Sequence, residues 1–342
     1  MKLFNKFLSW AVAKAKKSRL LQNLAEKPIS IDKLPQMGVF VDSGKRSHIL
    51  YQNLREIIKP GSSKASSIKP IVKNNAFYLQ KLEEADLDLA SIHPLIQATG
   101  KKLENAVVLE IGCDIGSFCC TLAKHGAEQI TGTDTSEYKS SSTNDDRRLI
   151  QTTLEDERKL LVDLSKSTSV VFKEDDICKS SLPSDTFDIV FSFDVLEHLS
   201  NPKNAFFHIQ RILKPGGIAI HRYNPFFSIN GGHSACTLDF LWGHVRLNSE
   251  DFVKYLEQIR PHELEYAKAF YFNGLNRMSL RDMKDFSTEV GLEVLGSLQF
   301  GKEQTMRMFN RDIWEECHVN YKNICMEDLV SSKVVVIQKK YE

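Results

Sequence analysis

The 342-residue sequence lacks several features that would place it at once in a broad class of proteins. It has no apolar run near the roughly 20 residues that cross a bilayer. Lys and Arg total 45 and Asp and Glu total 44, so no excess of positive charge favours a nucleic-acid partner. With 17 Gly and 10 Pro, the composition also excludes a collagen-like or low-complexity chain. These absences predict a soluble globular protein with a large core.

The seven cysteines show no pairing pattern. Their number is odd, and no two have the C-x-x-C spacing of redox and zinc motifs. Cys113 and Cys178 stand beside apolar segments, where small thiols are commonly buried. Because free thiols are typical of a reducing compartment, we expect a cytoplasmic protein.

The first hundred residues differ from the rest of the chain. Residues 1–24 place apolar side chains at near-helical spacing among lysines, with no acidic residue, which predicts a basic helix that docks on the protein. An anionic membrane surface is the less favoured partner for this helix. Prolines punctuate residues 25–75, for which we expect irregular structure, and small polar residues predict a linker near 59–67. We therefore expect a mostly helical extension over 1–100 and a second domain over 101–342.

From residue 105 onward, short apolar runs alternate with longer amphipathic segments. The runs predict strands over 107–111, 129–133, 169–172, 187–193, 218–223, 292–300 and 333–338. Helical patterns cover 118–125, 144–165 and 204–213. This alternation is typical of a parallel sheet with helices on both faces. Such a sheet binds ligands beyond the carboxyl ends of its strands, so the residues at those ends are the candidate site.

The turn after the first of these predicted strands carries Gly112 and Gly116, with Glu110 and Asp114 beside them. The dinucleotide motif G-x-G-x-x-G and the phosphate-binding motif G-x-x-x-x-G-K-[ST] are both absent. Acidic side chains at this turn disfavour a pyrophosphate. They favour a ligand that is cationic or that presents hydroxyl groups.

Acidic residues also follow the next three strands. Asp134 comes 22 residues after Gly112, a spacing suited to a carboxylate that accepts hydrogen bonds from ribose hydroxyls. Asp176 and the neighbouring Ile177 follow the third strand and suit the amine and one face of an adenine ring. Asp194 follows the fourth strand. Four neighbouring strand ends thus predict one acidic crevice for a nucleoside ligand.

The segments LEIGCDIG, TGTD, EDDI, FDIVFSFDVLEHL and LKPGG follow one another in this order over about 105–223. Together they resemble class I S-adenosylmethionine-dependent methyltransferases of the type 11 group. The resemblance implies an α/β fold with a Rossmann-like seven-stranded sheet, mostly parallel with an antiparallel C-terminal edge hairpin, and S-adenosyl-L-methionine as cofactor. It implies cofactor contacts from Glu110, Gly112, Cys113, Asp114, Gly116, Asp134, Thr135, Asp176, Ile177 and Asp194. The family often has glycine where this chain has Asp114, and a short acid there can face the methionine ammonium group.

The segment after the fifth strand predicts the acceptor site. It runs over about 224–275, longer than an ordinary connection, and resembles the lids with which relatives select substrates. Its polar residues suggest a base at His233 or His244 with Asp239, and acceptor contacts from Arg246, Trp242 and His233. The alternative is that the aromatic residues form the core of the lid and the polar ones cap its turns.

Two further points concern catalysis. His198 follows the fourth strand, and its Glu-His pair has either a catalytic role or a structural role belonging to the fold. We expect no metal, because the spacing between His233 and His244 is not a helical ligand spacing and no pair of thiols supports a site.

The sequence predicts methyl transfer to a small or medium polar acceptor, at an oxygen of a sugar or natural-product-like molecule. The even balance of charge and the lid favour a small-molecule partner over nucleic acid. One alternative is a non-catalytic module that binds S-adenosylmethionine or a nucleoside. The other is a membrane-associated methyltransferase of lipids or quinones, which depends on the basic segment 1–24.

Overall fold

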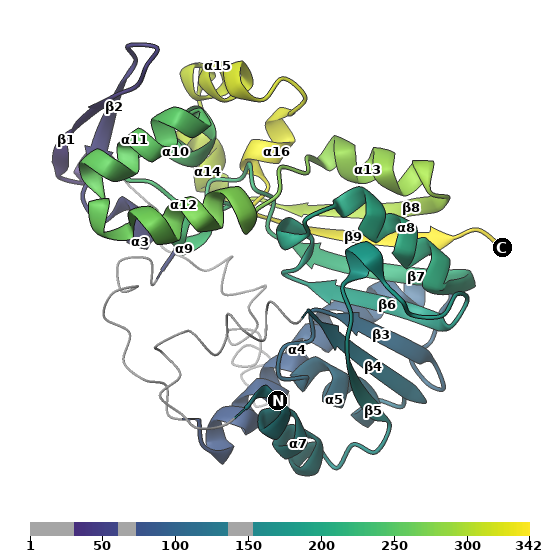
Figure 1. Cartoon of the computed structure of the whole chain (residues 1–342). Helices are drawn as coiled ribbons and strands as arrows, with labels where there is room; N and C mark the ends of the chain where they lie inside the picture. Colours follow the sequence, from purple (N-terminus) through teal and green to yellow (C-terminus); the bar gives the residue numbers. More distant parts are fainter. Residues whose placement is uncertain (1–30, 61–72, 136–152) are drawn as a thin grey trace, which may run out of the picture.

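The computed structural model describes residues 31–60, 73–135 and 153–342. The predicted basic helix over 1–24 and most of the predicted linker at 59–67 lie outside these residues. The main feature is a seven-stranded sheet with the order β5-β4-β3-β6-β7-β9-β8 (Figure 1). Its strands are β3 (Val107–Ile111), β4 (Gln129–Asp134), β5 (Val170–Glu174), β6 (Phe187–Phe193), β7 (Leu213–Tyr223), β8 (Leu292–Phe300) and β9 (Lys333–Lys340).

The direction of the strands confirms the predicted sheet. β5, β4, β3, β6 and β7 are parallel to their neighbours, whereas β9 is antiparallel to both β7 and β8. The sheet is therefore Rossmann-like with an antiparallel edge formed by the C-terminal strands. The predicted strands match the observed ones within a few residues, except that β7 already begins at Leu213.

Helices cover both faces of the sheet. On one face, α4 (Asn75–Ala98) and α5 (Ser117–Lys124) pack in a core that includes Val108 of β3. On the other face, α8 (Pro202–Ile212) and α13 (Leu280–Glu289) pack in a core that includes Leu109. Adjacent residues of β3 thus enter opposite cores, as the alternation of side chains along a strand requires. The near-continuous apolar sequence of the inner strands follows from this burial on both faces.

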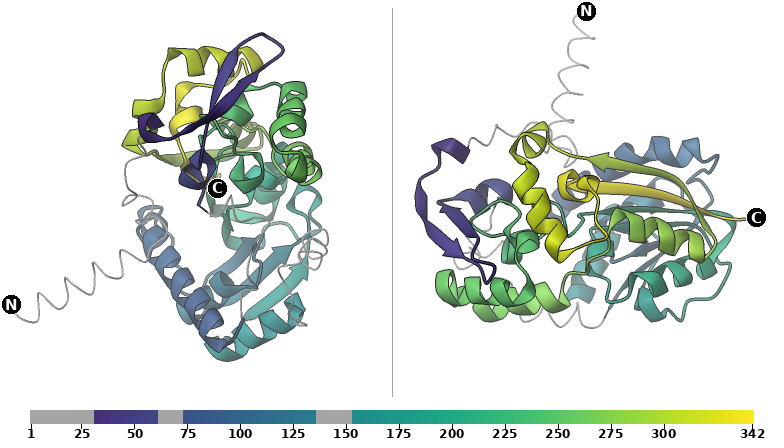
Figure 2. Two further views of the ribbon diagram at one scale, coloured as in Figure 1. Left: turned by 90° about the vertical axis from the view of Figure 1, so that its left-hand side faces the viewer. Right: turned by 90° about the horizontal axis from the view of Figure 1, so that it is seen from above.

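Three distant segments of the chain form a second layer, which we call the cap: residues 31–58, 224–275 and 303–330. Its elements are β1 (Gln36–Val41), β2 (Ser47–Tyr51), α3 (Leu54–Ile58), α9 (His233–Cys236), α10 (Gly243–Arg246), α11 (Ser249–Ile259), α12 (Leu264–Asn273), α14 (Glu303–Met308), α15 (Arg311–Asn320) and α16 (Met326–Val330). The cap has its own hydrophobic core, which contains residues of all three segments, including Phe40, Trp242 and Leu329. Seen from above, the β1–β2 hairpin lies at the end of the molecule away from the sheet (Figure 2).

The hairpin corrects the expectation of irregular structure over 25–75. β1 and β2 pair antiparallel, with Phe40 opposite His48, and both of these side chains are buried in the cap. The outward residues of β1 include the exposed Met37 and Val39. A half-buried strand is predicted from alternating apolar and polar residues. Because β1 has apolar residues on both of its faces, this alternation is missing from its sequence.

The cap sits at the carboxyl ends of β6 and β7. Its second segment begins directly after Tyr223, the last residue of β7. Beyond β6, Asn276 donates from its backbone to the carbonyl of Glu197 at 2.9 Å. The residues that follow α12 are therefore attached to the loop that follows β6, so the cap borders the sheet edge where the sequence predicts the ligand.

Among the described residues, no helix combines the length and apolar character needed to span a membrane.

The cap core gives a direct stability prediction. Trp242 is 1% exposed, and its indole nitrogen donates to the carbonyl of Leu329 at 2.9 Å. Trp242→Ala is expected to lower the free energy of unfolding by about 3–5 kcal/mol, because it leaves a cavity and an unpaired carbonyl. Urea-induced unfolding measures this loss. The control is Trp314→Ala at a partly buried position, and an equal loss in both variants would contradict the described cap core.

Candidate functional site

Gly112 and Gly116 flank the turn between β3 and α5. Their φ angles are +70° and +83°, values that residues with side chains rarely adopt. A Cβ at Gly112 would lie 2.3 Å from Cγ2 of Val195, and a Cβ at Gly116 would lie 2.3 Å from the ring of Phe172. The backbone conformation and the neighbouring side chains therefore require glycine at both positions, whether or not a ligand binds at the turn.

Asp114 lies in the same turn with φ +46°, a left-handed conformation that aspartate tolerates. Its Oδ1 is buried and has no hydrogen-bond partner among the described residues. A buried carboxylate oxygen without a partner costs free energy unless a ligand satisfies it. This oxygen could accept a hydrogen bond from an ammonium or hydroxyl group of a bound molecule.

Glu110 lies beneath the turn. The carboxylate is buried and accepts a hydrogen bond from Sγ of Cys119 at 2.9 Å. Burial raises the pKa of Glu110 to about 8, so the side chain is largely protonated at neutral pH. Glu110 is therefore a neutral group that joins β3 to α5 beside the glycine turn.

The pKa of Glu110 predicts a pH dependence of stability. The folded pKa of about 8 lies above the ordinary 4.5, so the protonated carboxyl stabilises the fold fully below pH 4.5, and this contribution is lost as pH rises towards about 8. Glu110→Gln is always neutral at this position. We compare the melting temperatures of the variant and the natural protein at each pH. The difference, variant minus natural protein, is expected to increase by several degrees from pH 5 to pH 8. The exposed Glu128→Gln is the control, and a difference that does not change with pH would contradict the prediction.

Asp134 ends β4 and is anchored from several sides. Its Oδ2 accepts from Nη2 of Arg158 at 2.9 Å and lies 3.5 Å from Sγ of Cys113. Burial raises the pKa of Asp134 to about 6, while Arg158 opposes this rise. Arg158 also donates from Nε to the carbonyl of Asp114 at 2.8 Å and lies over the ring of Phe172. Asp134 and Arg158 thus hold the glycine turn in place from the side of β4.

Sequence reasoning missed Arg158. The residue lies on α7 (Leu154–Ser165), whose start is fixed by a capping box between Thr153 and Asp156. This T-x-x-D pattern is visible in the sequence and fixes the N-terminus of the helix. With the helix so placed, Arg158 lies one turn from its start. The partner across the turn, Asp134, becomes evident only once α7 packs beside α5.

The residues predicted for adenine have structural contacts of their own. Asp176 accepts from the backbone of Cys178 at 2.9 Å and so caps a short 3-10 turn, and its side chain is 26% exposed. Ile177 is buried in the core between the sheet and α8. Thr135 is half-buried at the end of a described range. The carboxylate of Asp176 remains accessible, whereas Ile177 lies inside the protein.

Asp194 follows β6 and is partly exposed. Its Oδ1 accepts from Nδ2 of Asn224 at 3.0 Å, and Arg222 lies 3.9 Å from Oδ2. The guanidinium of Arg222 is buried and pairs with Asp88 of α4 at 2.8 Å. Asn224 also donates to Glu197, so one amide joins the two acidic residues beyond β6.

The structure brings His198 and His233 together beside Glu197. The centres of the two imidazole rings are 5.0 Å apart, and Nε2 of His233 lies 4.0 Å from Oε1 of Glu197. Burial lowers the pKa of His233 to about 3, so this imidazole is neutral at physiological pH. Burial raises the pKa of Glu197. Phe270 of α12 packs against both rings.

Two other residues predicted for the acceptor site lie in the cap core instead. His244 is fully buried, and its Nε2 donates to the carbonyl of Phe226 at 2.8 Å. Burial lowers the pKa of His244 to about 4. Trp242 packs in the same core and bonds Leu329. Their contacts are structural, because both side chains are enclosed by the cap.

Asp239 and Arg246 also have partners within the cap. The carboxylate of Asp239 accepts a hydrogen bond from the hydroxyl of Tyr255. Nε of Arg246 donates to Glu316 of α15 at 2.7 Å. Both side chains are thus held by partners within the cap, which agrees with the alternative in which polar residues of the segment stabilise the cap.

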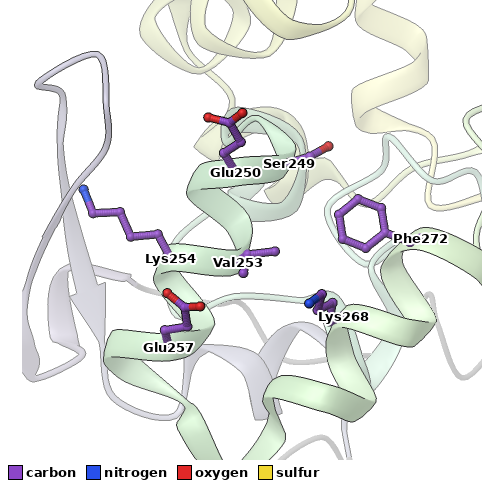
Figure 3. A pocket seen from close by; sticks show the side chains of 7 residues that line it. All are labelled: Ser249, Glu250, Val253, Lys254, Glu257, Lys268 and Phe272. Carbon is purple, nitrogen blue, oxygen red and sulfur yellow. The ribbon is translucent and has the colours of Figure 1, made fainter.

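A pocket of about 350 Å³ lies between α11 and α12 (Figure 3). It is lined by charged residues around Val253 and Phe272, including Lys254 and Lys268. Phe270 lies two residues before Phe272, which is about 200° around the helix. The pocket thus lies on the face of α12 opposite to the one that contacts His198 and His233, and it is separate from the candidate site.

The part of the chain that contains the glycine turn and the strand ends is similar to known proteins. A family model described as a methyltransferase domain matches residues 83–296, more than half of the chain. A ubiquinone biosynthesis O-methyltransferase of Maricaulis maris is 27% identical over 157 residues, covering 45% of this chain and 53% of the relative. A sterol 4-C-methyltransferase of Caenorhabditis elegans is 30% identical over 138 residues, covering 40% of this chain and 36% of the relative. The matches thus span about half or less of these relatives.

Solved structures are also similar to the chain. An S-adenosylmethionine-dependent methyltransferase from Mesorhizobium loti is 15% identical, with a TM-score of 0.44, and the match covers 74% of this chain and 99% of that one. The family match extends from α4 through the glycine turn, the strand ends of β4 to β7, and into β8. The chain therefore belongs to the methyltransferase domain family, as a class I S-adenosylmethionine-dependent methyltransferase.

Proposed function

We propose that this protein transfers a methyl group from S-adenosylmethionine to an oxygen atom of a small organic acceptor. The observation that carries the proposal is the contact between two loops. Val195, in the loop after β6, packs against Gly112 of the glycine turn, and Glu197 and His198 follow two and three residues later. A cofactor on the turn and an acceptor at the Glu197–His233 pair would thus be neighbours.

The residues around the turn fit the cofactor. When bound, S-adenosylmethionine supplies a methyl group that a sulfonium makes electrophilic. The ammonium and sulfonium charges suit a crevice that contains Asp114, Asp134 and Asp194. In this proposal, Asp114 receives the ammonium group, Asp134 the ribose hydroxyls, and Asp176 the adenine amine. Asp194, at the end of β6, lies towards the sulfonium.

The contacts at the acceptor end support a ring-bearing acceptor. The expectation of a sugar is based on Arg246 together with the histidines of the segment, and the guanidinium of Arg246 is engaged by Glu316. Beside His233 lies Phe270, with ring centres 5.7 Å apart, which offers a surface for an aromatic ring. The name of one relative, a ubiquinone biosynthesis O-methyltransferase, supports the same chemistry. We infer that a phenolic or quinone-like hydroxyl is the favoured acceptor.

A hydroxyl acceptor must lose its proton. His233 has a neutral imidazole, because burial lowers its pKa to about 3. Its Nε2 and Oε2 of Glu197 are both buried and have no hydrogen-bond partner among the described residues. An imidazole with so low a pKa is a weak base, so His233 would hold the acceptor hydroxyl rather than take its proton. Burial raises the pKa of Glu197, which makes its carboxylate the stronger base of the two. Asn224 fixes the carboxylate of Glu197 through its other oxygen.

The test is a screen for methyl transfer with S-adenosylmethionine labelled in the methyl group. Acceptors are hydroxylated quinones, simple phenols, sugars and sterols. We expect label in phenolic or quinone-like products, together with one equivalent of bound S-adenosylhomocysteine in calorimetry. Tight cofactor binding without transfer to any acceptor would favour the non-catalytic module. Transfer to sterols alone, or activity that requires vesicles, would favour the membrane-associated alternative.

A further inference from the structure

Glu197 and His198 lie in a short 3-10 turn after β6, and His233, the first residue of α9, comes 35 residues after His198. One potential ligand atom from each of the three residues nevertheless lies within 4.8 Å of the other two. We propose that Glu197, His198 and His233 bind a divalent transition-metal ion, with an open position for the oxygen of the acceptor. The role of the ion rests on the proposed function, whereas its binding does not.

The strongest evidence is a pair of unsatisfied buried atoms. Glu197 is 1% exposed, and its Oε2 has no hydrogen-bond partner among the described residues. The same is true of Nε2 of His233, which lies beside this carboxylate. An unpaired oxygen and an unpaired nitrogen, both buried and both able to donate a lone pair, are costly in the fold. A cation between them would satisfy both atoms.

The third residue is oriented for the same purpose. Nδ1 of His198 lies 2.5 Å from the carbonyl oxygen of Gly274. Since a carbonyl only accepts hydrogen bonds, Nδ1 carries the proton in this contact and Nε2 keeps the lone pair in the neutral ring. A backbone carbonyl that fixes a histidine tautomer in this way is a common outer contact in metal sites. Asn224 holds Oε1 of Glu197 through its backbone and its side chain, at 3.1 and 3.2 Å.

The donor set indicates the class of ion. Two imidazoles and one carboxylate suit Zn²⁺, Co²⁺, Mn²⁺ or Fe²⁺, whereas Mg²⁺ and Ca²⁺ prefer all-oxygen sites. Ligand atoms around tetrahedral Zn²⁺ lie about 3.4 Å apart. The potential ligand atoms of the three residues lie within 4.8 Å of one another, so they have to approach by at most about 1.4 Å. His198 is exposed, which leaves one side of the cluster open to an acceptor.

The position of the cluster gives the ion its role. Glu197 follows Val195, which touches the glycine turn, so the cluster borders the proposed cofactor site. A divalent ion there would hold the acceptor oxygen and lower the pKa of its hydroxyl group, as it does for bound water. Phe270 borders both imidazoles and would flank the ring of such an acceptor.

The test is direct metal binding by the full chain, stripped of metal with a chelator and then titrated with Co²⁺. We expect one equivalent to bind with weak visible absorption bands and no thiolate charge-transfer band. Glu197→Gln and His233→Asn should each weaken Co²⁺ binding by about tenfold or more. Asparagine suits position 233 because it tolerates the left-handed backbone there, with φ +51°. Zn²⁺ competition should abolish the Co²⁺ spectrum.

The control is His93→Asn, an exposed residue of α4, which should bind Co²⁺ like the natural protein. Binding that is absent in the natural protein, or unchanged in both cluster variants, would overturn the proposal. Titrations of the same proteins with S-adenosylhomocysteine distinguish the loss of a metal site from misfolding of a variant and from failure of the proposed function. Unchanged nucleoside binding shows that the variants are folded, and metal binding without nucleoside binding would count against the proposed function alone.

Discussion

Replacing Asp134 by Ala is expected to weaken the binding of S-adenosylhomocysteine about 5- to 150-fold, which corresponds to about 1–3 kcal/mol. The carboxylate is the group proposed to accept hydrogen bonds from the ribose hydroxyls. It is also held by Arg158, Cys113 and the backbone of Asp114, so its position is fixed before the ligand arrives. Calorimetry at pH 7.5, above the Asp134 pKa of about 6, measures the loss with the carboxylate ionised.

The variant also leaves a charge unpaired. Arg158 is buried, and without Asp134 its guanidinium loses its charged partner, which destabilises the fold. The double variant Asp134→Ala/Arg158→Met removes both charges and should regain stability without regaining affinity. The exposed Asp163→Ala on the same helix as Arg158 is the control. If the double variant bound the nucleoside like the natural protein, Asp134 would have no part in cofactor binding.

The second large effect is expected at His233. His233→Asn should lower the turnover number about 10²-fold, because the acceptor hydroxyl loses the imidazole that positions it beside Glu197. The affinity for S-adenosylhomocysteine should be unchanged, since the proposed cofactor contacts lie on the turn and at the ends of β4, β5 and β6, and His233 is none of them. The measurement is initial rates of transfer from labelled cofactor to the best acceptor found in the screen.

His93→Asn serves as the matched control for the rate measurement. A rate for His233→Asn within a few-fold of the natural protein would show that the imidazole is not needed to position the acceptor. A loss of nucleoside affinity equal to the loss of rate would instead assign His233 a structural role at the cofactor site.

The sheet could be predicted from the sequence because its signals are local. The run over 107–111 is apolar on both faces of β3, and the glycine turn follows it at once. Asp134 and Asp194 stand at predicted strand ends, so their positions at the crevice follow from the topology alone. The antiparallel edge formed by β8 and β9 was implied by the resemblance to the methyltransferases, and the strand pairing confirms it.

The cap could not be predicted in this way. Its core joins Phe40, Trp242 and Leu329, which lie about 90 to 290 residues apart in sequence. A segment rich in aromatic and polar residues after β7 looks the same whether it faces a ligand or another part of the chain. Only the packing shows that His244 faces Phe226 and that Arg246 faces Glu316.

The clusters within the candidate site share this difficulty. Asp134 was predictable, but its partner Arg158 depends on how α7 packs. The prediction of no metal compared His233 with His244, whose Nε2 instead donates to the carbonyl of Phe226 in the cap core. The neighbours of His233 are Glu197 and His198, and no local spacing pattern links residues that are 35 positions apart.

The central claim is that acidic side chains at adjacent strand ends bind the adenosyl cofactor. A crystal structure of the protein with S-adenosylhomocysteine tests it most directly. We predict that the ribose hydroxyls lie within hydrogen-bond distance of Asp134 and that the amino group of the ligand lies beside Asp114. A ligand bound elsewhere, or no ligand density at the turn between β3 and α5 at saturating concentration, would contradict the account.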